Sequence, residues 1–164
     1  GGGSGGSGGG GGSNGGGTVP TNVWVNLIAK HSGKCLDVTG GPGATAPETQ
    51  LEQWGCWGGS NQKFQFTAVN GGYQIMAQNS GLSLDVYGGY PYDGVPIIQY
   101  AFSPNLYDDV WNVSPNADGS FTFSAVSSGK CMDVTGISVD DGAAVHQWTC
   151  WGGDNQKWQI VPAQ

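Results

Sequence analysis

Three aspartates, Asp37, Asp85 and Asp133, stand 48 residues apart and mark the chemistry that this chain repeats. Each ends a similar phrase, which reads Gly-Lys-Cys-Leu-Asp, Gly-Leu-Ser-Leu-Asp or Gly-Lys-Cys-Met-Asp. A carboxylate accepts strong, charge-assisted hydrogen bonds, and an aromatic ring offers a flat apolar surface for stacking. Each unit also carries an aromatic residue directly after a glutamine, and these residues are Trp54, Tyr100 and Trp148. Any site built from this set exists in up to three copies.

The elements that carry these residues follow the same period. Apolar residues alternate with others in three segments, 25–29, 73–77 and 121–125, which predicts strands with one buried face. We expect about four short strands per unit, separated by Gly, Asn, Ser and Pro turns, and no sustained helix. Three units are too few for a propeller ring, so we expect them to close around a pseudo-threefold axis. One large aromatic residue per unit is expected in the core: Phe64, Trp111 and Trp158.

The chain is expected to form one folded domain, residues 21–164, with repeats at about 21–69, 70–117 and 118–164. Residues 1–20 are expected to form a flexible linker, because the first 17 are thirteen Gly, three Ser and one Asn. The sequence does not begin with Met and shows neither a signal peptide nor a membrane-spanning apolar run. We therefore interpret it as a fragment, with a further module, such as a catalytic domain, upstream of the linker.

The composition favours neutral ligands. The formal net charge is −7, the chain has five Lys and no Arg, and charged residues make up only 10% of it. Nucleic acids and anionic membranes are recognised largely through Lys and Arg, so we expect neither as a partner. Seven Trp and six Tyr favour binding by stacking instead.

The four cysteines form two pairs, Cys35 with Cys56 in the first unit and Cys131 with Cys150 in the third. The second unit has a serine and a phenylalanine in the matching places, so both members are missing together, as covalent partners would be. We therefore expect two disulfides, one within each of these units, and with them secretion to the extracellular space. A zinc site is the alternative, but the spacings are not CxxC and the two histidines do not accompany both pairs.

These motifs resemble the repeat of the ricin-type β-trefoil lectins, a group that includes the family 13 carbohydrate-binding modules. The resemblance rests on Gly-Lys-Cys-Leu-Asp-Val, Gln-Trp-Gly-Cys and Asn-Gln-Lys-Phe in the first unit, and on a fuller match in the third. It covers residues 21–164. It implies an all-β fold, the β-trefoil, with up to three shallow sugar pockets. It also implies galactose, N-acetylgalactosamine or xylose-containing chains as ligands.

The resemblance further implies which residues contact the sugar. They are Asp37, Trp54 and Asn61 in the first unit, and Asp133, Trp148 and Asn155 in the third. An indole ring covers the apolar face of a pyranose, while a carboxylate and an amide serve its hydroxyl groups. Such a site needs neither a metal ion nor a cofactor. The alternatives are structural, because the aspartates could cap turns and the tryptophans could be core residues.

Six residues flank these two sites and are included in them: Glu52, Trp57, Gln62, His146, Trp151 and Gln156. The glutamate and the histidine stand two residues before the stacking tryptophan, and would add a polar contact or remain solvated. The two tryptophans each follow a cysteine, and would form the rim of the pocket or cover the disulfide. The two glutamines would touch the sugar or orient the neighbouring aspartate.

The second unit departs from the pattern, and we expect its site to be weak, altered or lost. It keeps Asp85 and has Tyr100 in place of tryptophan, but the Asn-Gln pair becomes Asp108-Asp109. Adjacent carboxylates would repel one another and disturb the contacts to sugar hydroxyls. Because neighbouring residues of a strand face opposite sides, we do not expect this pair to act together in catalysis.

These observations predict a secreted, non-catalytic module that binds carbohydrate, as an accessory of a multidomain protein such as a glycoside hydrolase. The sequence contains no Gly-x-Ser-x-Gly or His-Glu-x-x-His motif, and we expect no catalytic residue. The alternative is a trefoil that binds protein, such as a protease inhibitor. Such proteins act through a single exposed loop, which gives no reason to repeat an aspartate, an aromatic residue and an asparagine in register.

Overall fold

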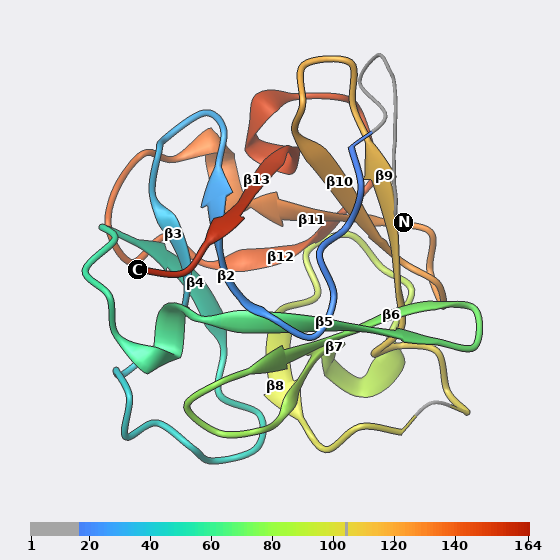
Figure 1. The fold of residues 1–164 in the computed structure, drawn as a ribbon. Coiled ribbons are helices and arrows are strands. Elements are labelled where there is room, and N and C mark those ends of the chain that lie inside the picture. Colours follow the sequence, from blue (N-terminus) through green and yellow to red (C-terminus); the bar gives the residue numbers. More distant parts are fainter. Residues whose placement is uncertain (1–16, 104) are drawn as a thin grey trace.

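The computed structural model describes residues 17–103 and 105–164, and shows twelve strands and no α-helix there (Figure 1). The all-β fold and the four strands per unit are therefore confirmed. Residues 1–16, most of the segment interpreted as a linker, lie outside the described residues. No helix in the described ranges is long and apolar enough to cross a membrane.

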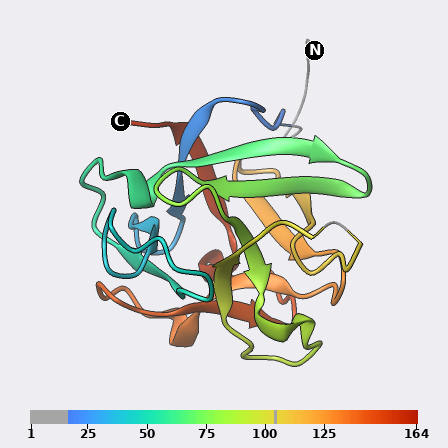
Figure 2. The same ribbon diagram turned by 90° about the horizontal axis from the view of Figure 1, so that it is seen from below.

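Six strands, two from each repeat, close into a barrel. They are β2 (Trp24–Ala29), β5 (Phe64–Val69), β6 (Gly72–Ala77), β9 (Trp111–Pro115), β10 (Phe121–Ala125) and β13 (Trp158–Pro162). Each pairs with the next in this order, and β13 pairs with β2 to complete the ring, all antiparallel. Closure protects the backbone groups that an open sheet would expose at its edges. Figure 2 shows the long β5–β6 ribbon that forms one side of the barrel.

The other six strands form three hairpins, one per repeat. They are β3 (Cys35–Val38) with β4 (Leu51–Trp54), β7 (Ser83–Val86) with β8 (Ile97–Tyr100), and β11 (Cys131–Val134) with β12 (Val145–Trp148). Each hairpin continues from a barrel strand through one antiparallel pair. The hairpins also meet one another through isolated bridges, which are Gln50↔Ile98, Glu52↔Ala144 and Pro96↔His146. This arrangement is the β-trefoil.

The core lies where the barrel strands turn their apolar face inward. The predicted core aromatics Phe64, Trp111 and Trp158 are fully buried. Trp158 stacks on Phe123, with ring centroids 6.3 Å apart. The indole N–H of Trp158 donates to the carbonyl of Met132 in β11 at 3.2 Å, and the indole of Trp111 makes the equivalent bond to β7. Each buried indole therefore joins the barrel to a hairpin without leaving a polar group unpaired.

Three buried glutamines, Gln53, Gln99 and Gln147, fasten each repeat to another. The amide of Gln53 donates to the carbonyls of Ser138 and Asp140 in the third repeat, at 2.8 and 2.9 Å. The other two glutamines bind loops of the first and second repeats in the same way. Because these side chains must point inward, the residue after each of them must point outward.

Candidate functional site

The hairpin of each repeat presents an aromatic ring to solvent. Gln53 is completely buried, whereas Trp54, the next residue of β4, is 43% exposed. Gln147 and Trp148 show the same alternation in β12. The possibility that these two tryptophans are core residues is therefore wrong, and their rings are free to stack against a ligand.

A cavity of about 310 Å³ lies beside the first hairpin and contains five of the six residues assigned to the first site. They are Asp37, Glu52, Trp54, Trp57 and Asn61. A cavity of about 370 Å³ occupies the matching place in the third repeat. It contains Asp133, His146, Trp148, Trp151 and Asn155. Residues that are far apart in the sequence thus converge on two equivalent pockets.

Gln62, the sixth residue of the first site, lies behind the pocket instead of lining it. It is fully buried in η1 (Ser60–Gln62), and its amide donates to Asp37 Oδ2 at 2.8 Å and to the carbonyl of Gly55 at 3.0 Å. Its own oxygen accepts from the backbone N–H of Trp57 at 3.0 Å. Of the two alternatives for Gln62, its burial and hydrogen bonds favour the orienting role. It holds the carboxylate and the rim tryptophan in fixed positions.

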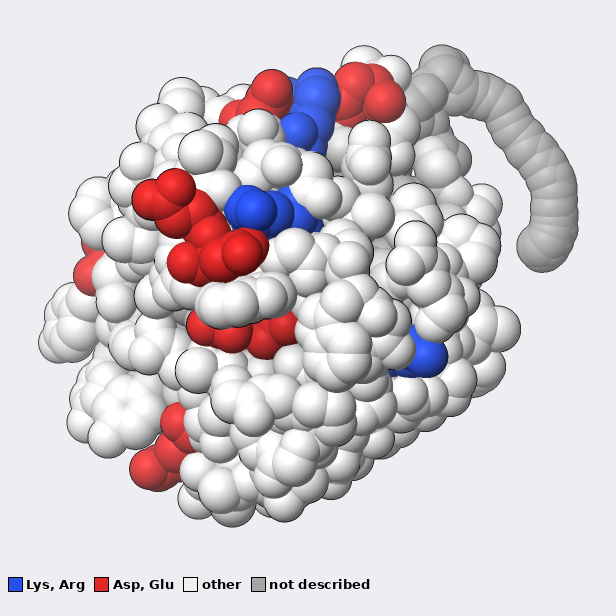
Figure 3. All heavy atoms as spheres, turned by 90° about the vertical axis from the view of Figure 1, so that its left-hand side faces the viewer, with Lys and Arg blue, Asp and Glu red and all other residues white. Residues whose placement is uncertain are grey.

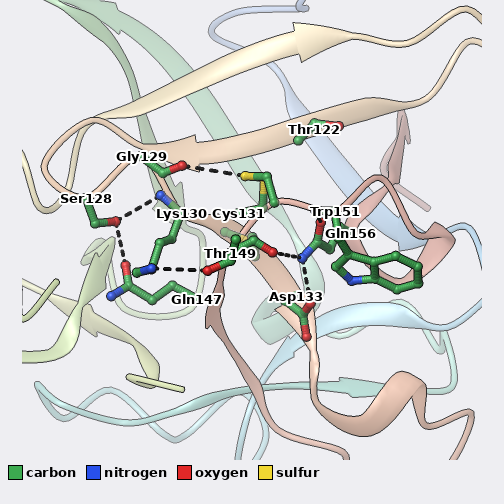
Figure 4. Close-up of a disulfide and its surroundings, with 12 residues drawn as sticks. Thr122, Ser128, Gly129, Lys130, Cys131, Asp133, Gln147, Thr149, Trp151 and Gln156 are labelled. Atoms are coloured by element: carbon green, nitrogen blue, oxygen red, sulfur yellow. Dashed lines mark hydrogen bonds between the residues drawn. A yellow bond between two sulfur atoms is a disulfide. The ribbon is translucent and has the colours of Figure 1, made fainter. Parts of the chain in front are cut away.

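Gln156 makes the same contacts in the third repeat, where it lies in η4 (Asp154–Gln156). It donates to Asp133 Oδ2 at 2.8 Å and to the carbonyl of Thr149 at 3.0 Å, and accepts from the N–H of Trp151 at 3.0 Å. Figure 4 shows the glutamine between the aspartate and the tryptophan. The orienting role is favoured for Gln156 in the same way.

The two asparagines each keep one unpaired oxygen. Asn61 Nδ2 donates to the carbonyl of Val38 and Asn155 Nδ2 to that of Val134, both at 3.1 Å. The Oδ1 atom of each asparagine is buried and has no hydrogen-bond partner among the described residues. A buried acceptor without a donor is costly, and such groups need an explanation. Because both asparagines line the cavities, a ligand hydroxyl could donate to these oxygens.

The strand register sets a different residue opposite the aspartate in each pocket. In the first repeat Asp37 pairs with Glu52. The pKa of Glu52 is raised to about 7, mainly by burial and also by hydrogen bonding to the carboxyl of Asp37. Burial also raises the pKa of Asp37, although hydrogen bonds with Glu52 and Gln62 oppose this rise. The two acids therefore hold a proton more readily than they would in water.

In the third repeat Asp133 pairs with His146 instead. The Nε2 atom of His146 donates to Asp133 Oδ1 at 2.8 Å, while Gln156 binds Oδ2 of the same carboxylate. The imidazole also stacks against the exposed Trp148, with ring centroids 5.4 Å apart. Both oxygens of this carboxylate are thus fixed from within the protein. The expectation that Glu52 and His146 could remain in solvent is not met, since both line the cavities.

The predicted disulfides are present. Cys35 is bonded to Cys56 and Cys131 to Cys150, and no cysteine is free, so the alternative of a zinc site is wrong. The tryptophan after the second cysteine of each pair folds back over a glycine. A Cβ atom on Gly59 would lie 2.2 Å from the ring of Trp57, so only glycine permits this position. The disulfide and the glycine therefore fix the position of the tryptophan at the rim of each pocket.

The second repeat has a cavity of about 290 Å³ with different chemistry. Its lining includes the three residues of the site predicted to be weak, Asp85, Tyr100 and Asp108, together with Glu48. The pKa of Asp85 is raised to about 8, mainly by burial and also by the nearby carboxyls of Asp108 and Asp109.

The expectation that Asp108 and Asp109 would point apart is wrong. The two residues lie in a turn and not on a strand. One carboxylate oxygen of each therefore approaches Asp85, and the three oxygens lie within 4.8 Å of one another. The second pocket is rich in acceptors where the other two combine acceptors with donors.

Sequence reasoning missed the residues just after the aspartate. Thr39 and Gly40 line the first cavity, and Thr135 and Gly136 line the third. The phrase Asp-Val-Thr-Gly, which occurs at 37–40 and 133–136, is the signal that could have identified them. In the second repeat the same phrase reads Asp-Val-Tyr-Gly, so the residue after Val86 differs as well.

A profile of the ricin-type beta-trefoil lectin domain matches residues 23–158. The chain belongs to this family. The lectin domain is similar to ThreeFoil, a designed threefold symmetric protein, with 37% identity, a TM-score of 0.80, and coverage of 84% of this chain and 97% of that one. It is similar to 1,3Gal43A, an exo-beta-1,3-galactanase from Clostridium thermocellum, with 34% identity and a TM-score of 0.79. That match covers 89% of this chain but only 31% of the enzyme.

The fold is also shared with the ricin B-like lectin of Macrolepiota procera, solved in complex with lactose. The identity is 18%, the TM-score is 0.76, and the match covers 89% of this chain and 99% of that protein. Membership of the family supports carbohydrate binding as the function of this chain. It also supports a non-catalytic module, as lectin domains of this family generally are.

Proposed function

We propose that the lectin domain binds neutral glycans of the galactose type through its first and third pockets. The observation that carries the proposal is a repeated set of three groups in one cavity. These are a carboxylate held in place by a buried glutamine, an asparagine oxygen without a partner, and an exposed indole. The first pocket supplies Asp37, Asn61 and Trp54, and the third supplies the same types.

Each group of the set suits one part of a pyranose. The apolar C–H face of the sugar stacks on Trp54, and two adjacent hydroxyls donate to the carboxylate of Asp37 through charge-assisted bonds. A further hydroxyl donates to Asn61 Oδ1, which satisfies an oxygen that has no partner among the described residues. Trp57, at the rim, extends the stacking surface to a second sugar unit. No metal ion takes part in these two pockets.

The choice of galactose-type ligands is supported by the 34% identity to the exo-beta-1,3-galactanase. The surface agrees with a neutral ligand, since charged side chains form only separate patches on the face shown in Figure 3. Because the lectin domain corresponds to under a third of that enzyme, we place it as an accessory module of a larger secreted protein. The Gly-rich residues 1–20 would then link it to a catalytic domain, and the two disulfides suit the extracellular space.

Calorimetric titration with β-1,3-linked galactobiose, lactose and xylobiose, in buffer containing a chelator, tests the proposal. We expect two sites per chain that prefer the galactosides. Asp37→Ala and Asp133→Ala should each remove one site, and the double variant should lose monosaccharide binding. Asp85→Ala is the matched control, because it changes the same position of the second repeat and should leave both sites intact. On a galactan-coated surface each single variant should lose far more than half of the apparent affinity, since linked sites multiply.

Other outcomes separate the alternatives. Binding that survives the double variant, or three equal sites, would show that the active repeats are wrongly assigned. Preference for xylobiose would move the ligand class to xylan. Absence of binding to any neutral glycan at millimolar concentration would refute sugar binding and favour a protein-binding trefoil.

A further inference from the structure

The second repeat holds three buried acidic residues that the proposed sugar sites do not use. Asp85 lies on β7, and Asp108 and Asp109 lie in the turn before β9. Each is more than nine-tenths buried, and one oxygen of each lies within 4.8 Å of the others. Buried carboxylates are costly unless a charge or a set of donors compensates them. The cluster therefore requires a partner.

The described residues do not supply that partner. None of the ion pairs in the described ranges engages Asp85, Asp108 or Asp109. The Oδ1 atoms of Asp108 and Asp109 are buried and accept no hydrogen bond from the described chain. The backbone N–H of Ser103 donates to Asp109, but to its other oxygen. Asp108, which is 8% exposed, lines the cavity together with Asp85, so the cavity leads to this cluster.

The other two repeats show what has been lost. There an Asn-Gln pair occupies these positions, and the glutamine donates to the aspartate of β3 or β11. In the second repeat Asp109 replaces that glutamine and can only accept when it is ionised. The residue opposite Asp85 is Ile98, which offers no donor either. Three buried aspartates thus converge where each sibling has one buried aspartate and a glutamine that donates to it.

We propose that Asp85, Asp108 and Asp109 bind a hard divalent cation, and that calcium is the ion of this site. The ligand set contains only oxygen, which favours calcium or magnesium over metals that prefer histidine or cysteine. Calcium binds six to eight oxygens at about 2.3–2.6 Å, so two ligands of one ion lie at most about 5 Å apart. The three oxygens lie within 4.8 Å of one another, so a single ion can contact all of them. This proposal departs from the expectation of no metal, which was drawn from the sugar sites of the first and third repeats.

The surroundings give the ion a route and room for water. The cavity of about 290 Å³ reaches Asp85 and Asp108 from solvent, and waters in it would complete the coordination shell. Glu48 lines the same cavity and adds negative charge at its mouth. The backbone of η2 (Tyr87–Gly89) passes close to the cluster, since a Cβ atom on Gly89 would lie 3.2 Å from Asp108 Oδ2. The backbone of η2 therefore encloses one side of the cluster.

Titration of the chelator-treated full chain with calcium chloride tests the proposal, followed by calorimetry and by thermal unfolding. We expect saturable binding of one calcium ion per chain, magnesium affinity at least tenfold lower, and a Tm that rises by a few degrees in millimolar calcium (on the order of what a ligand well above its Kd produces). The double variant Asp108→Asn with Asp109→Gln carries the pair found in the sibling repeats. It should fold and lose calcium binding and the Tm shift. Asp140→Asn with Asp154→Asn removes the same charge elsewhere and should keep both.

Each result decides the matter. No heat and no Tm shift up to 10 mM calcium (about a hundredfold above a sub-millimolar Kd) would overturn the proposal and leave protons as the partner of the cluster. Binding that persists in the sibling-like variant, or that is lost equally in the charge control, would also overturn it. Equal affinity for magnesium would refute the choice of calcium. If the sibling-like variant does not fold, Asp85→Asn replaces it with the same expectations. Sugar binding by the other two pockets, measured in chelator, is unaffected by any of these outcomes.

Discussion

Replacing Gln156 with glutamate tests how the third pocket is held together. The change is nearly isosteric, so it leaves no cavity, and the new side chain can still accept the N–H of Trp151. It loses the donor that now serves Asp133 Oδ2 at 2.8 Å and the carbonyl of Thr149 at 3.0 Å. It also sets a second carboxylate against the first. The variant therefore reproduces in the third repeat the arrangement that the second repeat already has.

The size of the effect follows from the bonds that are lost. A hydrogen bond to a buried charged group contributes about 1.5–3 kcal/mol and a neutral one about 1 kcal/mol. We therefore expect Gln156→Glu to lower the free energy of unfolding by about 2.5–4 kcal/mol at pH 8. The loss should be smaller at pH 5, because a proton shared between the two carboxyls removes the repulsion and restores a donor. Third-site affinity for galactosides should fall at least tenfold, because the carboxylate is no longer fixed.

Urea unfolding at pH 5 and pH 8 measures the change in the free energy of unfolding. Sugar titration in an Asp37→Ala background measures the affinity of the third pocket alone. Gln159→Glu is the matched control. Gln159 is exposed on β13, so its replacement adds the same charge outside the pocket. Equal stability of Gln156→Glu and the parent chain at pH 8 would refute the orienting role. So would a loss of the same size in the Gln159 control, or a loss that does not shrink at pH 5.

Two further predictions concern the first pocket and the disulfides. The pKa of Glu52 is about 7 in the folded chain against an ordinary value of 4.5, so its stabilising contribution is complete below pH 4.5 and is lost as the pH rises through 7. After allowance for partial exposure, the free energy of unfolding should fall by about 1–2 kcal/mol between pH 5 and pH 8. Glu52→Gln should flatten this part of the pH profile measured by urea unfolding. A variant with the same profile as the parent chain would contradict the raised pKa. Replacing Cys131 and Cys150 together by alanine should cost about 3 kcal/mol for a loop of this length and weaken sugar binding only at the third site. Unchanged stability, or equal weakening of both sites, would contradict that expectation.

The fold could be predicted because its signals are short-range and repeated. The 48-residue period, the alternation along 25–29 and its counterparts, and the joint absence of both cysteines from the second unit each depend only on spacing. The outward position of Trp54 also followed, since a strand places neighbours on opposite faces and one of the pair with Gln53 had to be buried.

The roles within the pocket could be predicted only in part. Whether Gln62 touches a ligand or supports Asp37 depends on which way a buried side chain turns, and spacing along the chain carries no such information. The error over Asp108 and Asp109 has a similar origin. A strand was assumed at these two positions, but they lie in a turn in the second repeat and in the short helices η1 and η4 in the other two.

The three pockets show that ligand chemistry can change while the sheet stays the same. The residue opposite the aspartate is Glu52, Ile98 or His146, yet the hairpin register is identical in all three repeats. The backbone pairing of each hairpin fixes that register without requiring a particular side chain at this position. Substitutions there, and at the Asn-Gln pair, can therefore alter the donors around the aspartate while the hairpin register is kept. When both change, as in the second repeat, a carboxylate that had donors becomes one of three acceptors. The ligand that such a pocket favours then shifts from a hydroxyl to a cation.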